Sequence, residues 1–284
     1  MIFTGGFSIA SSLGFCFATA FTPWDALMSR KSREVHILAS GSDGNCAVIR
    51  DDDTCLMIDA GLSGNQIERG LNEVGIEPYE LAAILITHEH RDHVMGAGVL
   101  SRRYQVPVGG NRMTLSFSGI DRLESPIVFE TSRAFRVGTI DVLPLPISHD
   151  AAEPNAFLVS YGGKRCLIAT DLGVVTDPIQ AALMGCDLVV LEANHDLKML
   201  LTGPYPHFLK EAIRGRKGHL SNADCARALK SSHKDGRKIF LAHLSRKNNR
   251  PDLACETVAD EIGCHRNEVD CLLGTGDTRS ISLC

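Results

Sequence analysis

The sequence predicts an α/β fold, a single domain of two similar β-rich halves with helices on the outside. Short apolar runs with the length and composition of strands recur in both halves and are separated by Gly, Asp and Ser turns. Segments with apolar residues at helical spacing follow several of these runs. No proline-rich or Ser/Gly-rich linker interrupts residues 35–275, and we therefore assign one domain to residues 34–284.

In the first half, strand-like runs surround one helix. The runs are EVHILA, CAVIR, CLMID and AAILIT. Between the third and the fourth, the segment SGNQIERGLNEVG carries Ile67, Leu71 and Val74 at helical spacing, with Ser63 available as an N-cap and Gly75 as a stop signal.

The second half begins with the run IVFE and repeats this order. Its further strand-like runs are FRVGTIDVLPLP, AFLVSYG, RCLIAT, DLVVLE and KIFLAH. One helix is opened by Asp177 and Pro178 and closed by Gly185. Another is marked by Ser221 and Asp224, whose S-x-x-D spacing forms a capping box.

The composition is that of a soluble globular protein. Of 284 residues, 44% are hydrophobic and 22% are charged, which excludes disordered and fibrous classes. The formal net charge of −5 gives no overall attraction to nucleic acid, although an acidic protein can carry a local basic track. The partner class must therefore come from the site. No membrane partner is expected, and the sequence indicates no oligomeric state.

The cysteines predict a cytoplasmic location. There are 10 of them, none in a C-x-x-C arrangement, and several stand inside apolar runs. Scattered cysteines of this kind are typical of buried thiols in a reducing compartment rather than of a disulfide framework.

Residues 1–33 are predicted to be an N-terminal extension. The first 27 are apolar but are broken by Gly, Ser, Thr and Pro, and they lack a basic n-region. They also lack the roughly 20 continuous apolar residues of a membrane helix. We favour a disordered extension or a mis-assigned start before Met28, and a weak signal peptide ending near ATA stays as an alternative.

The stretch LITHEHRDHVMG predicts a metal site. His88 and His90, at i and i+2, would lie on one side of an extended segment and can share one ion, while Asp92 and His93 can face a second. Imidazole with carboxylate suits Zn²⁺, Mn²⁺ or Fe²⁺, and the absence of thiolate ligands argues against a closed structural zinc.

Two ions need more ligands than this stretch supplies. His149, Asp171 and His243 each stand where an apolar run ends. A lone residue of this kind is ordinarily a cap or a surface group. Because the H-x-H-x-D-H motif is also present, we expect these three residues to complete the two-metal site.

These residues resemble the pattern of the metallo-β-lactamase superfamily, in which CLMIDAG, THEHRDH and the three strand-end residues have counterparts. The resemblance implies a four-layered αβ/βα sandwich. It implies one ion bound by His88, His90 and His149, a second bound by Asp92, His93 and His243, and Asp171 bridging both.

The same resemblance makes Asp59, in MIDAG, a residue that supports the ligands from behind, with a plain strand-end turn as the alternative. Glu89 is expected to face solvent or to support the ligands in the same way.

The metal motif alone does not select a substrate, because two ions can activate water against a phosphodiester, a lactam, a thioester or a lactone. In GHLSNAD, we expect His219 to protonate a leaving alkoxide and Ser221, at a helix N-terminus, to bind phosphate. Candidate phosphate donors elsewhere are Ser42, Asn45 and Ser245. The alternatives are an ordinary residue before a helix cap for His219 and plain turn chemistry for the Ser40–Asn45 segment.

The wider pattern is similar to that of the WalJ/YycJ family of bacterial metallo-β-lactamase-fold proteins. The matching segments are LASGSDGN, DAGLSG, THEHRDHVMGAGVLSRRY, PISHDAAEP, ATDLG, LEANHD, KGHLSN and FLAHLSRKNNRP. The family implies a cytosolic 5′→3′ exonuclease acting on DNA with two zinc or manganese ions per chain. A metal-bridging hydroxide would then attack phosphorus, with Asp92 and His219 as the catalytic residues.

Basic residues near the site could form the local track that the net charge hides: Arg102, Arg103, Arg246, Lys247 and Arg250. A solvated helix face or loop is the alternative.

Two other functions stay open. One is a small-molecule thioester or lactone hydrolase of the same fold, and the other is a non-catalytic DNA-binding module that keeps metals for structure.

Overall fold

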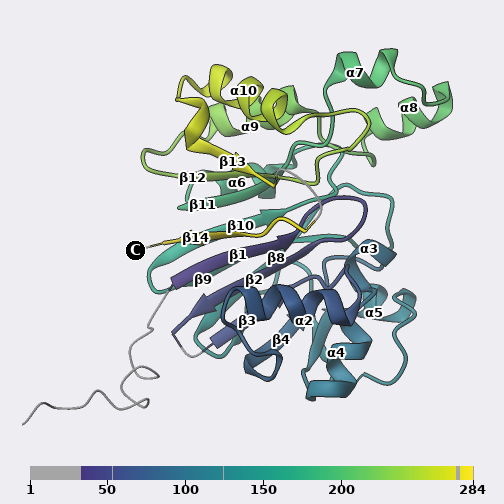
Figure 1. Ribbon diagram of the computed structural model, residues 1–284, viewed down its shortest axis with the longest axis vertical. Helices are drawn as coiled ribbons and strands as arrows, with labels where there is room; N and C mark the ends of the chain where they lie inside the picture. Colours follow the sequence, from purple (N-terminus) through teal and green to yellow (C-terminus); the bar gives the residue numbers. More distant parts are fainter. Residues whose placement is uncertain (1–32, 53, 124, 273–275, 284) are drawn as a thin grey trace, which may run out of the picture. The chain divides into compact units, whose positions relative to one another are not determined.

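The computed structural model describes residues 33–52, 54–123, 125–272 and 276–283. The predicted N-terminal extension, apart from its last residue, lies outside the described residues. The described chain forms two seven-stranded sheets with helices (Figure 1).

The first sheet has the strand order β14-β1-β2-β3-β4-β5-β6. From β14 to β3 neighbouring strands are antiparallel, and from β3 to β6 they are parallel. The strands are β1 (Arg33–Ala39), β2 (Cys46–Asp51), β3 (Thr54–Ile58), β4 (Leu81–Leu85), β5 (Val108–Asn111), β6 (Ile127–Phe129) and β14 (Arg279–Ser282).

The second sheet repeats this arrangement with the order β13-β12-β11-β10-β9-β8-β7. From β7 to β10 the strands are antiparallel, and from β10 to β13 they are parallel. The strands are β7 (Phe135–Val137), β8 (Ile140–Pro146), β9 (Asn155–Tyr161), β10 (Lys164–Ala169), β11 (Leu188–Glu192), β12 (Lys238–Ala242) and β13 (Val269–Cys271). The C-terminal strand β14 thus takes in the first sheet the position that β7 has in the second.

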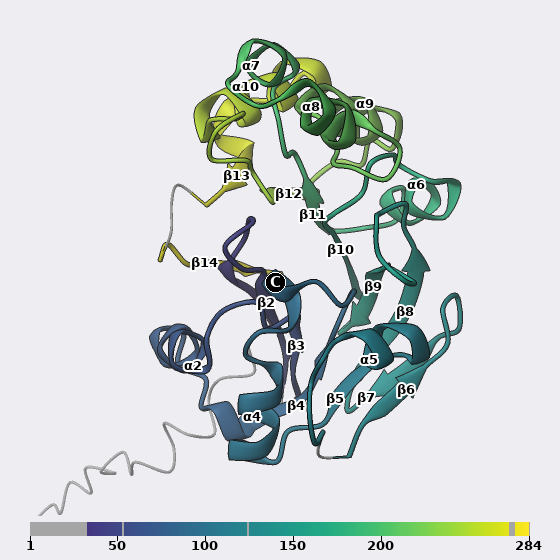
Figure 2. The same ribbon diagram turned by 90° about the vertical axis from the view of Figure 1, so that its right-hand side faces the viewer.

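Helices cover the outer face of each sheet (Figure 2). On the first sheet lie α2 (Gly64–Glu73) and α4 (Ala97–Tyr104), and on the second lie α6 (Asp177–Leu183), α9 (Asn222–Ser231) and α10 (Pro251–Ile262). The remaining helical segments are η1 (Pro78–Glu80), α3 (Arg91–Val94), α5 (Arg112–Phe117), α7 (Leu197–Thr202), α8 (His207–Arg214) and η2 (Arg266–Glu268).

Three apolar cores hold these layers together. One core packs the first sheet against its helices and includes Met57 and Leu71. The middle core joins the two sheets and includes Phe157 and Phe240. The third packs the second sheet against its helices. Three cores between four layers confirm the predicted αβ/βα sandwich of two similar halves.

The predicted helices form where their signals stand. Ser63 N donates to Gln66 Oε1 at the start of α2, and Ser221 Oγ accepts from Asp224 N at the start of α9. The run FRVGTIDVLPLP is two strands, because Gly138 adopts a positive φ of 55° and turns the chain between β7 and β8.

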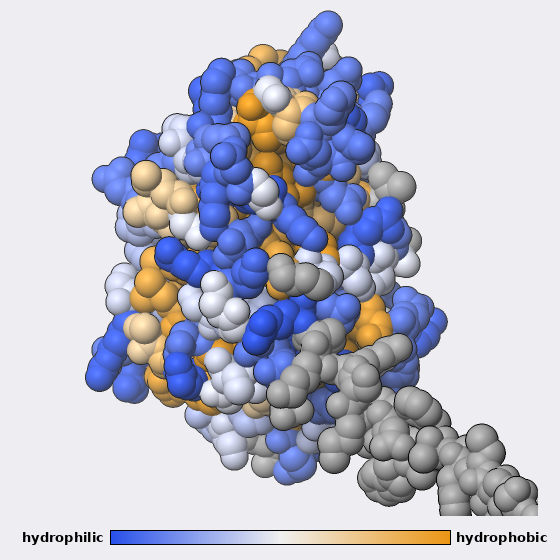
Figure 3. All heavy atoms as spheres, turned by 90° about the vertical axis from the view of Figure 1, so that its left-hand side faces the viewer, coloured by the Kyte–Doolittle hydropathy of each residue, from blue (hydrophilic) through white to orange (hydrophobic). Residues whose placement is uncertain are grey.

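The exterior is largely polar. On the face shown in Figure 3, hydrophilic residues predominate and apolar residues form separate groups between them. Within the described part of the chain, no helix is both long and apolar enough to span a membrane.

The loop after β3 packs directly against the predicted metal motif. Gly61 N donates to Asn45 O at 2.9 Å, and Asn45 N donates to Asp92 O at 2.8 Å. A Cβ atom on Gly61 would lie 1.7 Å from Asp92 O, a distance at which the backbone must move. Only glycine fits at this contact.

Replacing Gly61 with alanine should therefore displace the motif loop. We expect Gly61→Ala to lower the free energy of unfolding by about 1–3 kcal/mol, the usual cost of overpacking, in chemical denaturation. The matched control is Gly70→Ala inside α2, where the nearest atom to the new Cβ lies at an ordinary 3.4 Å. This control should be neutral or stabilising, and equal losses in both variants would contradict the close-contact explanation.

Candidate metal centre

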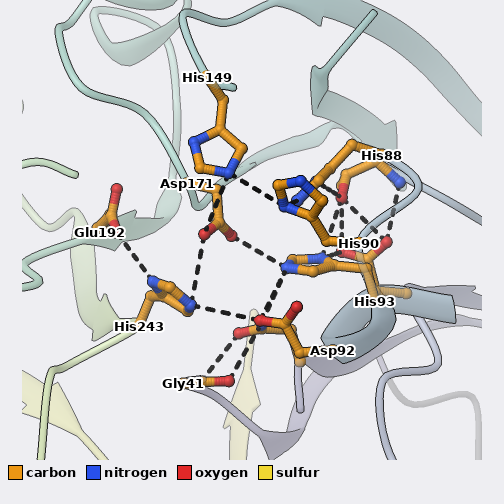
Figure 4. Close-up of polar contacts among 12 residues, drawn as sticks. Gly41, His88, His90, Asp92, His93, His149, Asp171, Glu192 and His243 are labelled. Carbon is orange, nitrogen blue, oxygen red and sulfur yellow. Dashed lines mark hydrogen bonds and ion pairs between the residues drawn. The ribbon is translucent and has the colours of Figure 1, made fainter. Parts of the chain in front are cut away.

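Seven polar side chains converge where strands of both sheets end (Figure 4). Four come from the segment after β4, which continues into α3. The others follow β8, β10 and β12. The seven are the residues predicted as ligands: His88, His90, Asp92, His93, His149, Asp171 and His243.

The first predicted set forms a compact group of nitrogens. His88 Nε2 lies 3.1 Å from His90 Nδ1, which lies 3.3 Å from His149 Nε2. The three ligand atoms thus lie close enough to share one ion.

The second predicted set forms a neighbouring group. Asp92 Oδ2 lies 3.7 Å from His93 Nε2 and 3.8 Å from His243 Nε2. Asp171 reaches both groups, because its Oδ2 lies 3.1 Å from His93 Nε2 and its Oδ1 lies 3.9 Å from His149 Nε2. This is the placement expected of a bridging carboxylate.

The residues fit a pair of divalent cations. Apart from the ion-pair contacts among the predicted ligands, Asp171 Oδ2 and His243 Nε2 are buried with no hydrogen-bond partner among the described residues, although buried polar atoms ordinarily have one. Imidazole nitrogens and carboxylate oxygens are the donors that zinc and manganese accept. Such clusters are typical of a dinuclear metal site, and the assignment of each ligand stays a prediction.

The pKa values of the cluster indicate that its carboxylates lie beside protonated histidines in the absence of a metal ion. Burial alone would lower the pKa of His93, but the carboxylates of Asp59 and Asp171 raise it to about 10. Burial opposes ionisation of Asp171 as well, yet His243 and His93 hold its pKa well below the ordinary value. A bound metal ion would take the place of these protons as the positive charge beside the carboxylates.

Strand-end strain turns several of these side chains inward. Asp59, Asp171 and His243 adopt positive φ values of 58°, 58° and 54°. Each such residue costs on the order of 1 kcal/mol and persists only where its surroundings hold it. The three residues follow β3, β10 and β12, and all are buried.

A second layer of contacts orients the ligand rings. His93 Nδ1 donates to Asp59 Oδ2 at 2.7 Å, which directs Nε2 toward the site. Thr87 Oγ1 lies 2.9 Å from the same carboxylate oxygen and 3.0 Å from His88 Nδ1. Asp59 thus has the geometry expected of it. Glu89 Oε1 accepts from Ala152 N at 2.7 Å and so joins the motif to the loop after His149.

His219 lies beside the metal cluster and is bound to a carboxylate that our sequence analysis missed. His219 Nδ1 donates to Glu192 Oε1 at 2.8 Å, and His243 Nδ1 donates to the same oxygen at 2.9 Å. Glu192 Oε2 accepts from the backbone N–H of Leu172 at 2.8 Å. The Glu192 side chain is completely buried at the end of β11, so the strand-end rule that found Asp171 would have found it too.

Glu192 also sets the charge of His219. Burial would lower the pKa of His219, but the Glu192 carboxylate raises it above the ordinary value. His219 can therefore carry a proton beside the metal ligands.

The predicted phosphate donors differ in availability. Ser221 Oγ donates to the Asp224 carboxylate at 2.5 Å and accepts from its backbone, so the hydroxyl is used as a helix cap. Asn45 is buried, accepts from Gly41 N and contacts His93 at 3.0 Å through Nε2, the nitrogen that faces the site. Ser42 and Ser245 both line a cavity beyond Gly41.

The predicted basic track is only partly present. Arg102 donates to Asp121 O at 2.9 Å and Arg103 pairs with Glu68, so both hold α4 to its neighbours. Arg250 pairs with Asp252 at 3.1 Å.

Comparison with known proteins identifies this arrangement. The family model described as the metallo-beta-lactamase superfamily matches residues 39–223. The chain belongs to the metallo-β-lactamase superfamily. A crystal structure of the metallo-β-lactamase-fold protein YhfI from Bacillus subtilis covers 88% of the chain and 99% of its own, with a TM-score of 0.68 and 15% identity.

Closer sequence relatives are two named exodeoxyribonucleases. Exodeoxyribonuclease YycJ from Bacillus anthracis is 36% identical over 80% of this chain and 88% of its own length. Exodeoxyribonuclease WalJ from Streptococcus pneumoniae is 36% identical over 83% of this chain and 90% of its own. The chain is a metallo-β-lactamase-fold metallo-hydrolase related to these proteins.

The ligand assignment predicts metal content. The purified protein should bind about two equivalents of zinc or manganese, as two-metal sites of this kind do, measured by elemental analysis. Asp171→Asn should lose at least one equivalent, and chelation should lower the melting temperature of the wild type because bound ions stabilise the folded state. His233→Asn, at an exposed histidine paired with Asp235, is the control and should keep both ions. An Asp171→Asn variant with full metal content would contradict the bridging assignment.

Proposed function

We propose that the chain is a metal-dependent exodeoxyribonuclease that degrades DNA in the 5′→3′ direction with two zinc or manganese ions, in the cytoplasm. The relatives named exodeoxyribonuclease support the substrate. The thiols support the compartment, because all eight cysteines of the described residues are free and seven of them are buried.

The observation that carries the proposal is the pairing of His219 with Glu192. A phosphodiester leaves an alkoxide that needs a proton, whereas a thioester leaves a thiolate that does not. The His219 ring centroid lies 5.2 Å from that of His243 and 5.5 Å from that of His149, so this proton donor adjoins both predicted metal groups.

In the proposed reaction, different residues of the chain have different roles. Two bound ions would supply an activated water at neutral pH and neutralise the charge that develops on the phosphate oxygens. Asp59 and Thr87 fix the rings of His93 and His88. Glu192 fixes His219 with its Nδ1–H in the carboxylate contact, so that Nε2 is the atom that gives its proton to the leaving oxygen.

Removing the proton donor should slow the hydrolysis of two phosphodiester substrates to different extents. His219→Ala should slow DNA cleavage by about 10²–10⁴-fold, the usual contribution of general acid catalysis. The same variant should hydrolyse bis(p-nitrophenyl) phosphate at a rate much closer to that of the wild type, because p-nitrophenolate leaves without a proton. Labelled single- and double-stranded DNA, with the label at either end, measures the rate, the direction and the stepwise products.

Three outcomes would contradict this assignment. Equal losses of His219→Ala on both substrates would remove His219 as the acid. Turnover of a thioester or lactone without any turnover of DNA would identify a small-molecule hydrolase. Salt-dependent DNA binding without turnover by the metal-loaded wild type would identify a binding module.

Glu192 should be needed for both the acid and the metal. Glu192→Gln keeps the size of the side chain but leaves one acceptor oxygen for two imidazoles and two backbone N–H groups. We expect a loss of about 10–100-fold in DNA cleavage together with weaker metal binding, as for other groups that orient ligand histidines. Rates and a metal titration curve equal to those of the wild type would show that the carboxylate has only a structural role.

A further inference from the structure

A cavity of about 790 Å³ adjoins the metal centre on the side of His243. Its wall includes the Ser40–Gly44 turn, and this turn also supports the predicted ligands. Ser40 Oγ accepts from His243 N at 2.7 Å, and Gly41 N donates to Asn45 Oδ1 at 3.0 Å. Figure 4 shows Gly41 next to the cluster, below His243 and Asp92. A molecule that fills the cavity would thus lie against the turn that contacts His243 and Asn45.

The loop that follows His243 forms another part of the wall and brings cations to it. Arg246, Lys247 and Arg250 line the cavity, and Arg69 lines it from α2. Arg246 pairs with Asp43 and Arg250 pairs with Asp252. Arg69 and Lys247 form no ion pair with a carboxylate among the described residues, so they are available to an anionic ligand.

An aromatic side chain completes the lining. Tyr205, from the connection between α7 and α8, places its ring centroid 5.5 Å from Lys247 Nζ. Lys247 Nζ lies over the Tyr205 ring, so the pair brings together a cation and an aromatic ring. These are the two elements of single-strand binding sites, in which the cation holds a phosphate and the ring stacks on a base.

The size of the cavity agrees with this chemistry. Pockets for compact organic ligands have volumes of about 300–1,000 Å³, so the cavity has room for a nucleotide. Leu38, Leu62 and Leu244 form apolar parts of the lining on which a base or sugar can pack. The lining contains four cationic side chains, including Arg246 and Arg250, and three carboxylates, Asp43, Glu73 and Asp277. The lining therefore carries a small excess of positive charge in a chain whose net charge is −5.

We propose that this cavity binds the nucleotide that adjoins the scissile phosphate on the His243 side, with its phosphate on Arg69 and Lys247 and its base on Tyr205. The inference rests on the proposed nuclease function and gives that function its strand-binding site. An uncharged acyl group, as in a thioester or lactone substrate, would leave both cations without a partner.

The test uses the metal-loaded full chain and a short single-stranded oligonucleotide with phosphorothioate linkages, which resists cleavage. Binding is measured by fluorescence anisotropy over a range of salt concentrations. Arg69→Gln and Lys247→Gln should each weaken binding and reduce the slope of log K against log[salt] by about 0.7, the value for one lost single-strand phosphate contact.

Tyr205→Ala should weaken binding by about fivefold or more, because a base–aromatic stack is lost, and should leave the salt slope unchanged. Tyr205→Phe keeps the ring and should bind like the wild type. The matched control for the lost charge is Lys230→Gln, because Lys230 lies on α9 and pairs with Glu261 at 2.9 Å, away from the cavity. This control should change neither the affinity nor the slope.

The outcomes separate this inference from the proposed function. The cavity assignment would be overturned if the wild type degrades DNA and the three variants bind the oligonucleotide as tightly as the wild type does. The variants are Arg69→Gln, Lys247→Gln and Tyr205→Ala. This result would leave the proposed nuclease function in place. A metal-loaded wild type that neither binds the oligonucleotide nor degrades DNA would overturn both. If Lys230→Gln reduces the slope of log K against log[salt] as much as Lys247→Gln does, the reduction comes from the overall charge of the protein. This result would overturn the assignment to this cavity.

Discussion

The carboxylate of Asp171 is the contact on which the metal centre depends, because it joins the ligands of one sheet to those of the other. Its oxygens lie 3.1 Å from His93 Nε2 and 3.4 Å from His243 Nε2, and these two histidines follow strands of different sheets. The carboxylate is 2% exposed. A buried charge of this kind is costly unless cations surround it, so the site is stable only with protons or metal ions between its carboxylates.

This constraint explains why the two sheets must be held so firmly. The middle core between them carries large apolar side chains from both, including Phe157 and Phe240. Three of the inward-facing residues, Asp59, Asp171 and His243, also have strained left-handed backbones. The packing of the layers therefore maintains conformations that the isolated loops would not keep.

Much of this could be predicted from the sequence, because the relevant signals are local. The H-x-H-x-D-H spacing and the polar residues after apolar runs identified seven side chains that the fold brings together. The helix N-caps at Ser63 and Ser221 were also predicted from the sequence. The motif and the caps each lie within a few positions, whereas His149, Asp171 and His243 became informative only once the motif had predicted a metal site.

What the sequence did not reveal depends on contacts between distant segments. Strand β14 has the short and polar sequence RSIS, and only its pairing with β1 makes it a strand. Arg103 stands in a basic helix, and only the fold shows that Glu68 neutralises it. Glu192 is a different case: it stands at the end of an apolar strand as a polar residue, but a glutamate there is also typical of an ordinary surface group, and only the fold shows that it is buried between His219 and His243.

Glu192 connects the two parts of the site that determine metal binding and substrate choice. One carboxylate oxygen accepts from Nδ1 of both His219 and His243, so each ring directs its Nε2 away from Glu192. One of these rings is a predicted metal ligand and the other is the proposed acid. Both rings therefore take their orientation from the same side chain. Under the proposed function, this shared carboxylate holds the acid, His219, next to the predicted ligand His243.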